Sequence, residues 1–309
     1  MDGDRMRKAI LAGGSGLVGK ELSQLLTSAG WEVVILSRKA KEGTPRSVVW
    51  DGATLGPWVS ELESADALIN LAGHPVSVPW TDENKKLIVS SRVNTTRLLG
   101  EACTRCETPP KRWVQASAVG IYPDLGDTVV TEGSAPGPAD SFLVETCLQW
   151  EAAARAHCPE ATSLGFVRIG IVLSENGGML EPLVKLTKAF LGGHTGTGKQ
   201  YVPWIHELDL ARLFQWMIDQ PDVSLVNGCG PDPATMAHFM EELRKAIGRP
   251  WSPPVPTPML KLASALRLAP DASLALSGVR AVPEKALQNG FTFQFPTLPQ
   301  ALTDLLGKK

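Results

Sequence analysis

The sequence is poor in several residue classes, and each shortage excludes a kind of protein. Its 309 residues include five cysteines, an odd and sparse set that argues against a disulfide framework and fits a reducing compartment. No apolar run approaches the roughly 20 residues that a membrane-spanning helix requires. The polar start of the chain, followed by only a short apolar run, predicts no secretory signal. We therefore expect a cytoplasmic protein without a membrane partner.

Charge of one sign is not in excess either. Lys and Arg number 30 against 32 Asp and Glu, a net charge of −2, which favours neither nucleic acid nor polyphosphate as a partner. The histidines and cysteines show no metal-ligand spacing, so no metal site is predicted. Tyrosine is scarce, with Tyr122 and Tyr201 the only two. A small-molecule substrate is expected, bound by a monomer or homodimer.

What the sequence does contain is an alternation of strand and helix patterns. Apolar runs of strand length are followed by segments with apolar residues at helical spacing. Strands are predicted at residues 8–12, 33–36, 48–50, 67–71, 113–117, 164–173 and 225–227, and helices at 17–29, 83–105, 141–157 and 207–219. The predicted fold class is α/β, a doubly wound parallel sheet of the Rossmann type.

A glycine-rich turn lies between the first predicted strand and the first helix, with the sequence Gly13-Gly14-Ser15-Gly16-Leu17-Val18-Gly19. In such a turn the first glycine allows the bend, the next lets the backbone approach a diphosphate, and the last lets helix and strand pack closely. The helix N-terminus adds free N–H groups and a partial positive charge. The turn predicts a dinucleotide site with contacts from Gly13, Ser15, Gly16, Leu17 and Val18.

A nucleoside-triphosphate loop is the competing interpretation of the same glycines. Residues 14–20 and 193–199 both match G-x-x-x-x-G-K. Both fail at the next position, where Glu21 and Gln200 replace the Ser or Thr that ligates magnesium. The sequence therefore argues against an NTPase.

The end of the second predicted strand selects between the nicotinamide dinucleotides. An NAD site has a carboxylate there, which accepts hydrogen bonds from the ribose hydroxyls. Here the strand ends with Ser37 and Arg38, and a guanidinium binds the 2′-phosphate that a carboxylate repels. The sequence predicts NADP (NADPH), unless Arg38 is an ordinary surface cation.

The pattern loosens beyond residue 174, where glycine and proline become frequent. We predict an NADP-binding Rossmann domain from residues 1–174 and 201–230. A smaller C-terminal α+β substrate lobe is predicted from residues 175–200 and 231–309. A chain of this length has room for about two such units.

Motifs along nearly the whole chain carry a family resemblance. They are the glycine turn, Asn70-Leu71-Ala72-Gly73, Ser91-Arg92-Val93-Asn94, Ser117-Ala118-Val119-Gly120-Ile121-Tyr122, Trp150-Glu151, Pro203-Trp204-Ile205-His206 and Gly290-Phe291-Thr292-Phe293. Together they resemble the extended short-chain dehydrogenases/reductases of the NAD-dependent epimerase/dehydratase superfamily, in the atypical "epimerase-family" branch often labelled cell-division-inhibitor-like.

The resemblance implies roles for further residues. Leu71, Ala72 and Gly73 would pass beside the cofactor ribose, and Asp51 would lie near the adenine. Ser117 would match the serine that hydrogen-bonds the reacting oxygen in related enzymes, or else it is only the polar end of a strand.

One departure from the family pattern limits the functional prediction. Active members use a Tyr-x-x-x-Lys pair, in which the lysine lowers the pKa of the phenol so that it can exchange a proton. Neither Tyr122 nor Tyr201 is followed by lysine at this spacing. In the matching segment, the tyrosine and lysine positions are taken by Leu143 and Cys147.

Other residues are candidates for the roles that the missing Tyr-x-x-x-Lys pair leaves open. Arg92 replaces an asparagine of the family pattern, and it binds either an anionic substrate or an internal carboxylate such as Glu145. Tyr122 either donates a proton or shapes the substrate site. The catalytic candidates are thus Ser117, Tyr122 and Arg92. The substrate-binding candidates are Glu145, Gln200, Trp204 and His206, the last of which is otherwise a structural histidine.

Two functions stay open at this point. The first is an NADP(H)-dependent oxidoreductase or epimerase with a non-standard active site, acting on a small carbonyl or hydroxy compound that Arg92 would favour as an anion. The second is a non-catalytic NADP(H)-binding regulatory or sensor protein, because the Tyr-x-x-x-Lys pair is missing.

Overall fold

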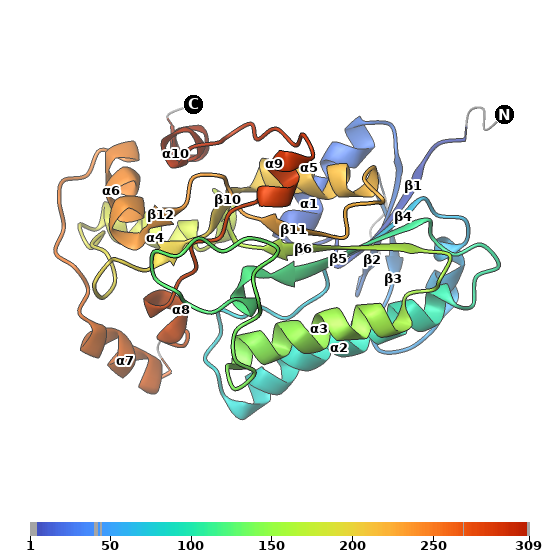
Figure 1. Cartoon of the computed structure of the whole chain (residues 1–309), viewed down its shortest axis with the longest axis horizontal. Coiled ribbons are helices and arrows are strands. Elements are labelled where there is room, and N and C mark those ends of the chain that lie inside the picture. The colour runs from blue at the N-terminus through green and yellow to red at the C-terminus, as the bar shows by residue number, and fades with distance from the viewer. Residues whose placement is uncertain (1–4, 40–42, 44, 268, 308–309) are drawn as a thin grey trace.

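A parallel sheet forms the centre of the molecule (Figure 1). The computed structural model describes residues 5–39, 43, 45–267 and 269–307. The strands lie in the order β11-β6-β5-β4-β1-β2-β3, each parallel to its neighbours. Their bounds are β1 Lys8–Ala12, β2 Glu32–Ser37, β3 Arg46–Val49, β4 Ala67–Asn70, β5 Arg112–Ala118, β6 Ser163–Ile169 and β11 Leu225–Gly228. The predicted fold class is confirmed.

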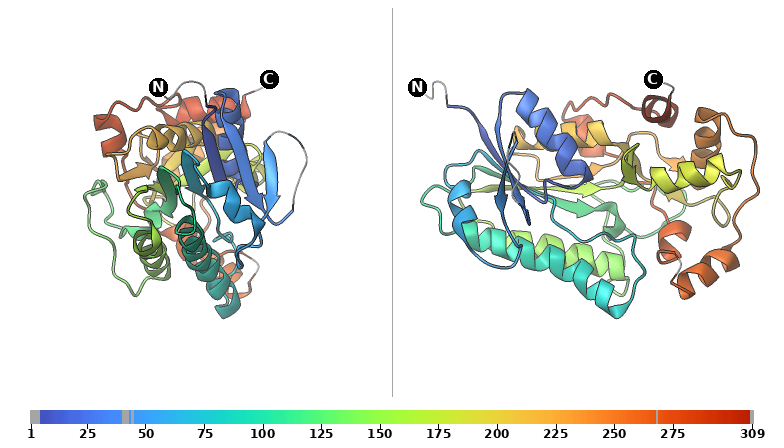
Figure 2. Two further views of the ribbon diagram at one scale, coloured as in Figure 1. Left: turned by 90° about the vertical axis from the view of Figure 1, so that its right-hand side faces the viewer. Right: turned by 180° about the vertical axis from the view of Figure 1, so that it is seen from behind.

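Helices cover both faces of this sheet, which is why its central strands are apolar throughout (Figures 1 and 2). Helices α1 (Leu17–Ser28) and α5 (Glu207–Ile218) pack together on one face. Helices α2 (Asp82–Cys103) and α3 (Phe142–His157) pack together on the other. The strand order reverses between β1 and β4. In a sheet of this kind ligands bind outside the carboxyl ends of the strands at that point.

A smaller lobe lies beyond the carboxyl ends of the strands (Figure 1). Two short sheets belong to it, one with the order β10-β7-β8 and one that pairs β12 with β9. Its elements are β7 Ile171–Ser174, β8 Gly177–Gly178, α4 Leu180–Lys188, β9 Tyr201–Val202, β10 Trp204–His206, β12 Ala234–Thr235, α6 Met236–Ala246, α7 Thr257–Ala265, α8 Ser273–Leu276 and α10 Leu298–Leu306. The lobe therefore closes over the edge at which a ligand is expected.

The strand predicted at 164–173 is in fact two strands that belong to different sheets. The break is at Gly170, whose N–H donates to the carbonyl of Gly228, while Ile171 donates to the carbonyl of Pro203. A Cβ at position 170 would lie 2.0 Å from the Pro203 oxygen. Only glycine allows this approach, so the chain leaves the large sheet and enters the lobe at this residue.

The C-terminal part of the chain contributes to the core of the large sheet as well as to the lobe. Helix α9 (Glu284–Gln288) packs against β11 of the large sheet. Phe291 and Phe293 join the core between the sheet, α1 and α5. Strands β9 and β10 belong to the two small sheets. Of the helices in the described ranges, none combines the length and apolarity needed to cross a bilayer.

Candidate functional site

The glycine-rich turn is held tightly against the loop that follows β4. Gly13 has a φ of +77°, and a Cβ there would lie 2.8 Å from the backbone nitrogen of Ala72. A Cβ at Gly19 would lie 2.4 Å from the Cα of Gly14, which lets α1 start close to the turn. These two positions require glycine for packing within the protein itself.

Gly16 is different, because its missing side chain faces open space. A Cβ there would meet only the Gly13 carbonyl oxygen, at 3.5 Å. Gly16 is the N-cap of α1, with no side-chain cap and no acidic residue in the first turn. The unpaired N–H groups of that turn carry a partial positive charge, as a diphosphate requires. The turn therefore fits a dinucleotide diphosphate.

The residues predicted to select the coenzyme lie at the end of β2. Arg38 is exposed and has no hydrogen-bond or ion-pair partner within the described ranges. Ser37 donates its hydroxyl hydrogen to the carbonyl of Lys39. An exposed guanidinium at the end of β2 is available to a 2′-phosphate.

Asp51 lies in the loop after β3, but its carboxylate is used locally. It accepts hydrogen bonds from the N–H groups of Ala53 and Thr54 and from the Thr54 hydroxyl, at 2.8, 2.9 and 2.7 Å. These bonds lower the pKa of Asp51 to about 2. The side chain thus fixes its own turn, and its exposed carboxylate keeps acceptor capacity toward a ligand.

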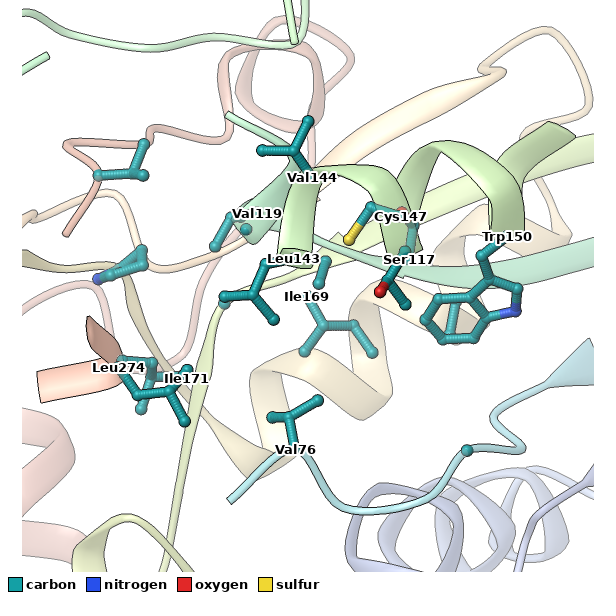
Figure 3. Close-up of a pocket in the computed structure, with 18 of the residues that line it drawn as sticks. Val76, Ser117, Val119, Leu143, Val144, Cys147, Trp150, Ile169, Ile171 and Leu274 are labelled. Carbon is teal, nitrogen blue, oxygen red and sulfur yellow. The ribbon is translucent and has the colours of Figure 1, made fainter. Parts of the chain in front are cut away.

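A cavity of about 900 Å³ runs from the glycine turn to the lobe. Figure 3 shows its walls, in which apolar side chains from α3, from the ends of β6 and β7 and from α8 point inward. The cofactor and catalytic candidates from the sequence that line it are Gly13, Gly16, Leu17, Val18, Leu71, Gly73, Arg92, Ser117 and Tyr122. The structure thus brings three catalytic candidates to the same space as the glycine turn.

The four residues predicted to bind the substrate are not among those that line this cavity. Glu145 is exposed on α3 and accepts a hydrogen bond from Gln149. The Gln200 amide donates to backbone oxygens inside the lobe, and the indole of the buried Trp204 donates to the backbone carbonyl of Asp232. These contacts hold secondary structure together.

His206 is a structural residue for the same reason. Its ring stacks on Phe295 with centroids 3.9 Å apart, and its Nδ1 accepts the N–H of Leu208 at the start of α5. Its Nε2 lies 3.2 Å from Asp304. Burial lowers the pKa of His206, since a charged ring is poorly solvated there.

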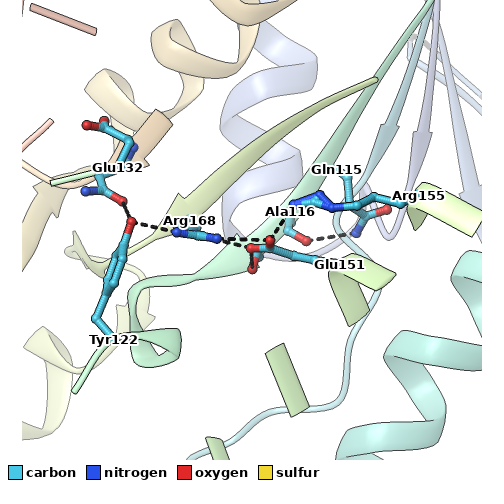
Figure 4. Close-up of polar contacts among 9 residues, drawn as sticks. Gln115, Ala116, Tyr122, Glu132, Glu151, Arg155 and Arg168 are labelled. Carbon is cyan, nitrogen blue, oxygen red and sulfur yellow. Dashed lines mark hydrogen bonds and ion pairs between the residues drawn. The ribbon is translucent and has the colours of Figure 1, made fainter. Parts of the chain in front are cut away.

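Ser117 and Tyr122 are joined by a buried polar network, of which Figure 4 shows Tyr122, Arg168 and Glu151. The Ser117 hydroxyl donates to Glu151 at 2.8 Å, and Arg168 donates to both oxygens of Glu151 at 2.8 and 3.0 Å. Arg168 also donates to the Tyr122 oxygen at 2.7 Å, while the phenol donates to Asn227 at 2.9 Å. Both hydroxyl hydrogens are therefore used inside the protein.

The negative charge of Glu151 and the positive charge of Arg168 stabilise each other in this network. Burial opposes the charge of Glu151, but the hydrogen bonds and charge of Arg168 outweigh it, so the pKa of Glu151 lies below its usual value. Burial raises the pKa of Tyr122, which keeps the phenol protonated. Cys147, at the position where the family has lysine, has a pKa raised by burial to about 12. A protonated thiol cannot lower the pKa of a phenol as a lysine does.

Several cavity residues escaped the sequence analysis. His74, Trp80, Tyr201 and Leu274 line the walls together with Leu143 and Cys147. No local pattern marks loop residues such as His74 as cavity-lining. Arg168, in contrast, had a signal: a cation inside the apolar run of β6 must find a buried partner.

Comparison with known proteins agrees with this geometry. Residues 9–228 match the "NAD dependent epimerase/dehydratase family", and residues 255–305 match a domain of unknown function, DUF1731. The chain is 34% identical over 304 residues to the human epimerase family protein SDR39U1, which covers 97% of this chain and 99% of the relative. It is also 34% identical to YfhF of Bacillus subtilis, over 97% of this chain and 98% of the relative.

Solved structures give the same result. A crystal structure of human SDR39U1 (isoform 2) with NADPH superposes with a TM-score of 0.87 at 32% identity, covering 97% of this chain and 99% of that one. A nucleoside-diphosphate sugar epimerase from Corynebacterium glutamicum has a TM-score of 0.78 at 29% identity, over 98% of this chain and 59% of that one. The chain belongs to the NAD-dependent epimerase/dehydratase family.

Proposed function

We propose that the protein is an NADPH-dependent oxidoreductase or epimerase that acts on a small carbonyl or hydroxy compound. The observation that carries this proposal is the continuity of the cavity, which joins the glycine turn to Ser117 and Arg92. Gly16 and the first turn of α1 would hold the diphosphate, with Leu71 and Gly73 beside the ribose. The NADPH in the human relative's structure agrees with this choice of coenzyme.

Arg38 is the residue proposed to distinguish the two coenzymes. Replacing it with alanine removes one charge-assisted contact to the 2′-phosphate, which NAD lacks. We expect Arg38→Ala to weaken NADPH binding about 10- to 100-fold and to leave NADH binding within about twofold. Isothermal titration calorimetry with both coenzymes measures this. Equal weakening of both would contradict the assignment.

Bound NADPH supplies a hydride at the nicotinamide ring. The chain itself would orient the substrate: Ser117, whose hydrogen goes to Glu151, offers an oxygen lone pair to a substrate hydroxyl. Arg92 offers N–H donors to a substrate oxygen. Arg168 and Asn227 hold the Tyr122 phenol in place. Tyr122 would therefore act as a positioning residue that fixes the part of the cavity wall next to Ser117.

A second function is favoured by the same hydroxyl contacts. Because Ser117 and Tyr122 both donate inside the protein and Cys147 is protonated, the described residues show no free acid of the usual family type. A protein that binds NADPH and reports its level to a partner needs no such acid. This alternative predicts coenzyme binding without turnover.

Stopped-flow measurement of NADPH oxidation with a library of carbonyl compounds separates the two functions. For an oxidoreductase, we expect turnover with some members of the library and, for members that also carry a hydroxyl, a fall of about tenfold in kcat/KM for Ser117→Ala, the worth of one hydrogen bond from that hydroxyl to the Ser117 oxygen. Ser60→Ala, which removes an exposed hydroxyl far from the cavity lining, is the matched control. Binding of NADPH with no turnover across the library would favour the sensor.

A further inference from the structure

The Arg92 guanidinium is held as a flat group between two surfaces. On one side its Cζ lies 5.0 Å from the centre of the Trp150 ring. On the other side lies Gly73, where a Cβ would be 3.0 Å from the Arg92 Cζ and 3.2 Å from Nη2. Gly73 therefore leaves the space that the guanidinium fills. Such a fixed plane limits the directions in which its N–H groups can donate.

Only one edge of this guanidinium is used by the protein. Nη1 donates to the carbonyls of His74 and Ile88 at 2.9 and 3.0 Å. Within the described ranges, Nη2 and Nε have no hydrogen-bond partner, and neither is a fully enclosed atom. Arg92 lines the cavity, so its free edge is open to a ligand there.

Arg92 also lacks the carboxylate that a cation in such surroundings requires. The expected partner, Glu145, is exposed and bonded to Gln149, and no ion pair of Arg92 occurs among the described residues. Burial lowers the pKa of Arg92, a sign that its charge is poorly solvated. A desolvated guanidinium with two nitrogens free to donate is the usual receptor for a planar anion.

The other residues that line the cavity limit which further chemical groups the bound anion can have. Besides Arg92, its lining includes His74 and Asp124 as acidic or basic side chains, and, within the described part of the chain, no lysine. Apolar side chains form most of the remaining wall, namely Val76, Trp80, Val119, Leu143, Val144, Trp150, Ile169, Ile171 and Leu274. A second diphosphate, besides that of the coenzyme, brings at least two charges, and Arg92 is the only arginine or lysine among the described residues that line the cavity, so its charge has too few partners there.

We propose that the cavity binds an apolar, flat monocarboxylate, whose two oxygens accept hydrogen bonds from Nη2 and Nε of Arg92 while its body packs on the apolar wall. The proposal rests on the proposed function, because it names the substrate class of that same site. A carbonyl or hydroxyl next to the carboxylate would then lie toward Ser117.

Binding, measured apart from turnover, tests this proposal. The full chain is saturated with NADP⁺ and titrated by calorimetry with benzoate, with its uncharged isostere benzamide, and with UDP-glucose. We expect benzoate to bind at least about tenfold more tightly than benzamide, and UDP-glucose to bind more weakly than benzoate. Arg92→Met should weaken benzoate about 10- to 100-fold and leave benzamide unchanged.

Two further variants test whether the orientation of the Arg92 guanidinium matters in addition to its positive charge. Gly73→Ala keeps Arg92 but displaces its guanidinium, so it should also weaken benzoate. Arg97→Met removes an exposed cation from the same helix and should change nothing.

Several outcomes would overturn the proposal. It fails if benzoate does not bind or binds no better than benzamide. It also fails if Arg92→Met retains full benzoate affinity, or if UDP-glucose is the tightest ligand. Loss of NADPH affinity in Arg92→Met, equal to its loss of benzoate affinity, would instead place the guanidinium on the coenzyme. Failure of the proposed function shows separately, as NADPH oxidation that no compound supports.

Discussion

Replacing Glu151 with glutamine is expected to lower the free energy of unfolding by about 3–5 kcal/mol, because it leaves the Arg168 guanidinium buried without a countercharge. Glu151 and Arg168 are both almost fully buried, and their ion pair has N–O distances of 2.8 and 3.0 Å. Ser117 and Tyr122 depend on the same two side chains for their orientation. Chemical denaturation followed by tryptophan fluorescence measures the loss.

A surface pair provides the matched control for this variant. Glu101, in the last turn of α2, and Arg105, just beyond that helix, form an exposed ion pair at 2.9 Å, so Glu101→Gln should lower the free energy of unfolding by less than about 1 kcal/mol. In the double variant Glu151→Leu with Arg168→Met, both charges are removed, and much of the lost stability should return. A Glu151→Gln variant as stable as the control would show that the buried charges are not coupled.

The same network sets a dependence on pH. The pKa of Glu151 is lower in the folded protein than in the unfolded chain, so its ionised form stabilises the fold above the unfolded pKa of about 4.3. That contribution is lost as the pH falls through the folded value. Glu151→Gln should therefore narrow the difference in stability between pH 7 and pH 3.

The sequence predicted the strands of the large sheet well, because each is an apolar run that local pattern reveals. It failed at Gly170, where the run continues through a change of sheet. There the reason is a contact with Pro203, more than thirty positions along the chain, that no local pattern carries. Predicted helices such as 141–157 agree with α3 (Phe142–His157) because their apolar spacing is also local.

The site was only partly accessible from sequence for a related reason. The glycine turn has a local signature, but the use of each hydroxyl depends on distant partners. Ser117 meets Glu151 from another helix, and Tyr122 meets Asn227 from another strand. The prediction that Arg92 pairs with Glu145 followed from charge alone. In the structure the two face different surroundings, and Gly73 supplies the space for the guanidinium.

Substitution at Gly16 is the sharpest test of the coenzyme site, because it separates binding from folding. Gly16→Val should weaken NADPH binding at least about 100-fold, since its side chain would enter the space in which the backbone approaches the diphosphate. The backbone at Gly16 has φ −75° and ψ 179°, which any residue adopts, and its Cβ direction is open. We therefore expect the free energy of unfolding to fall by no more than about 1–2 kcal/mol, the cost of a poorer N-cap, which leaves the protein folded for the binding measurement.

Gly30 supplies the opposite control. It has a φ of +82°, and a Cβ at this position would have no atom within 4 Å, so Gly30→Ala strains the backbone without touching the turn. It should destabilise the fold by about 1 kcal/mol and leave NADPH affinity unchanged. For both variants, calorimetry measures NADPH binding and denaturation measures stability, so an effect on binding is distinguished from an effect on folding. If Gly16→Val bound NADPH like the unaltered protein, the diphosphate would have to lie elsewhere. The roles inferred for Ser117 and Arg92 would then be unsupported, because they depend on the position of the coenzyme.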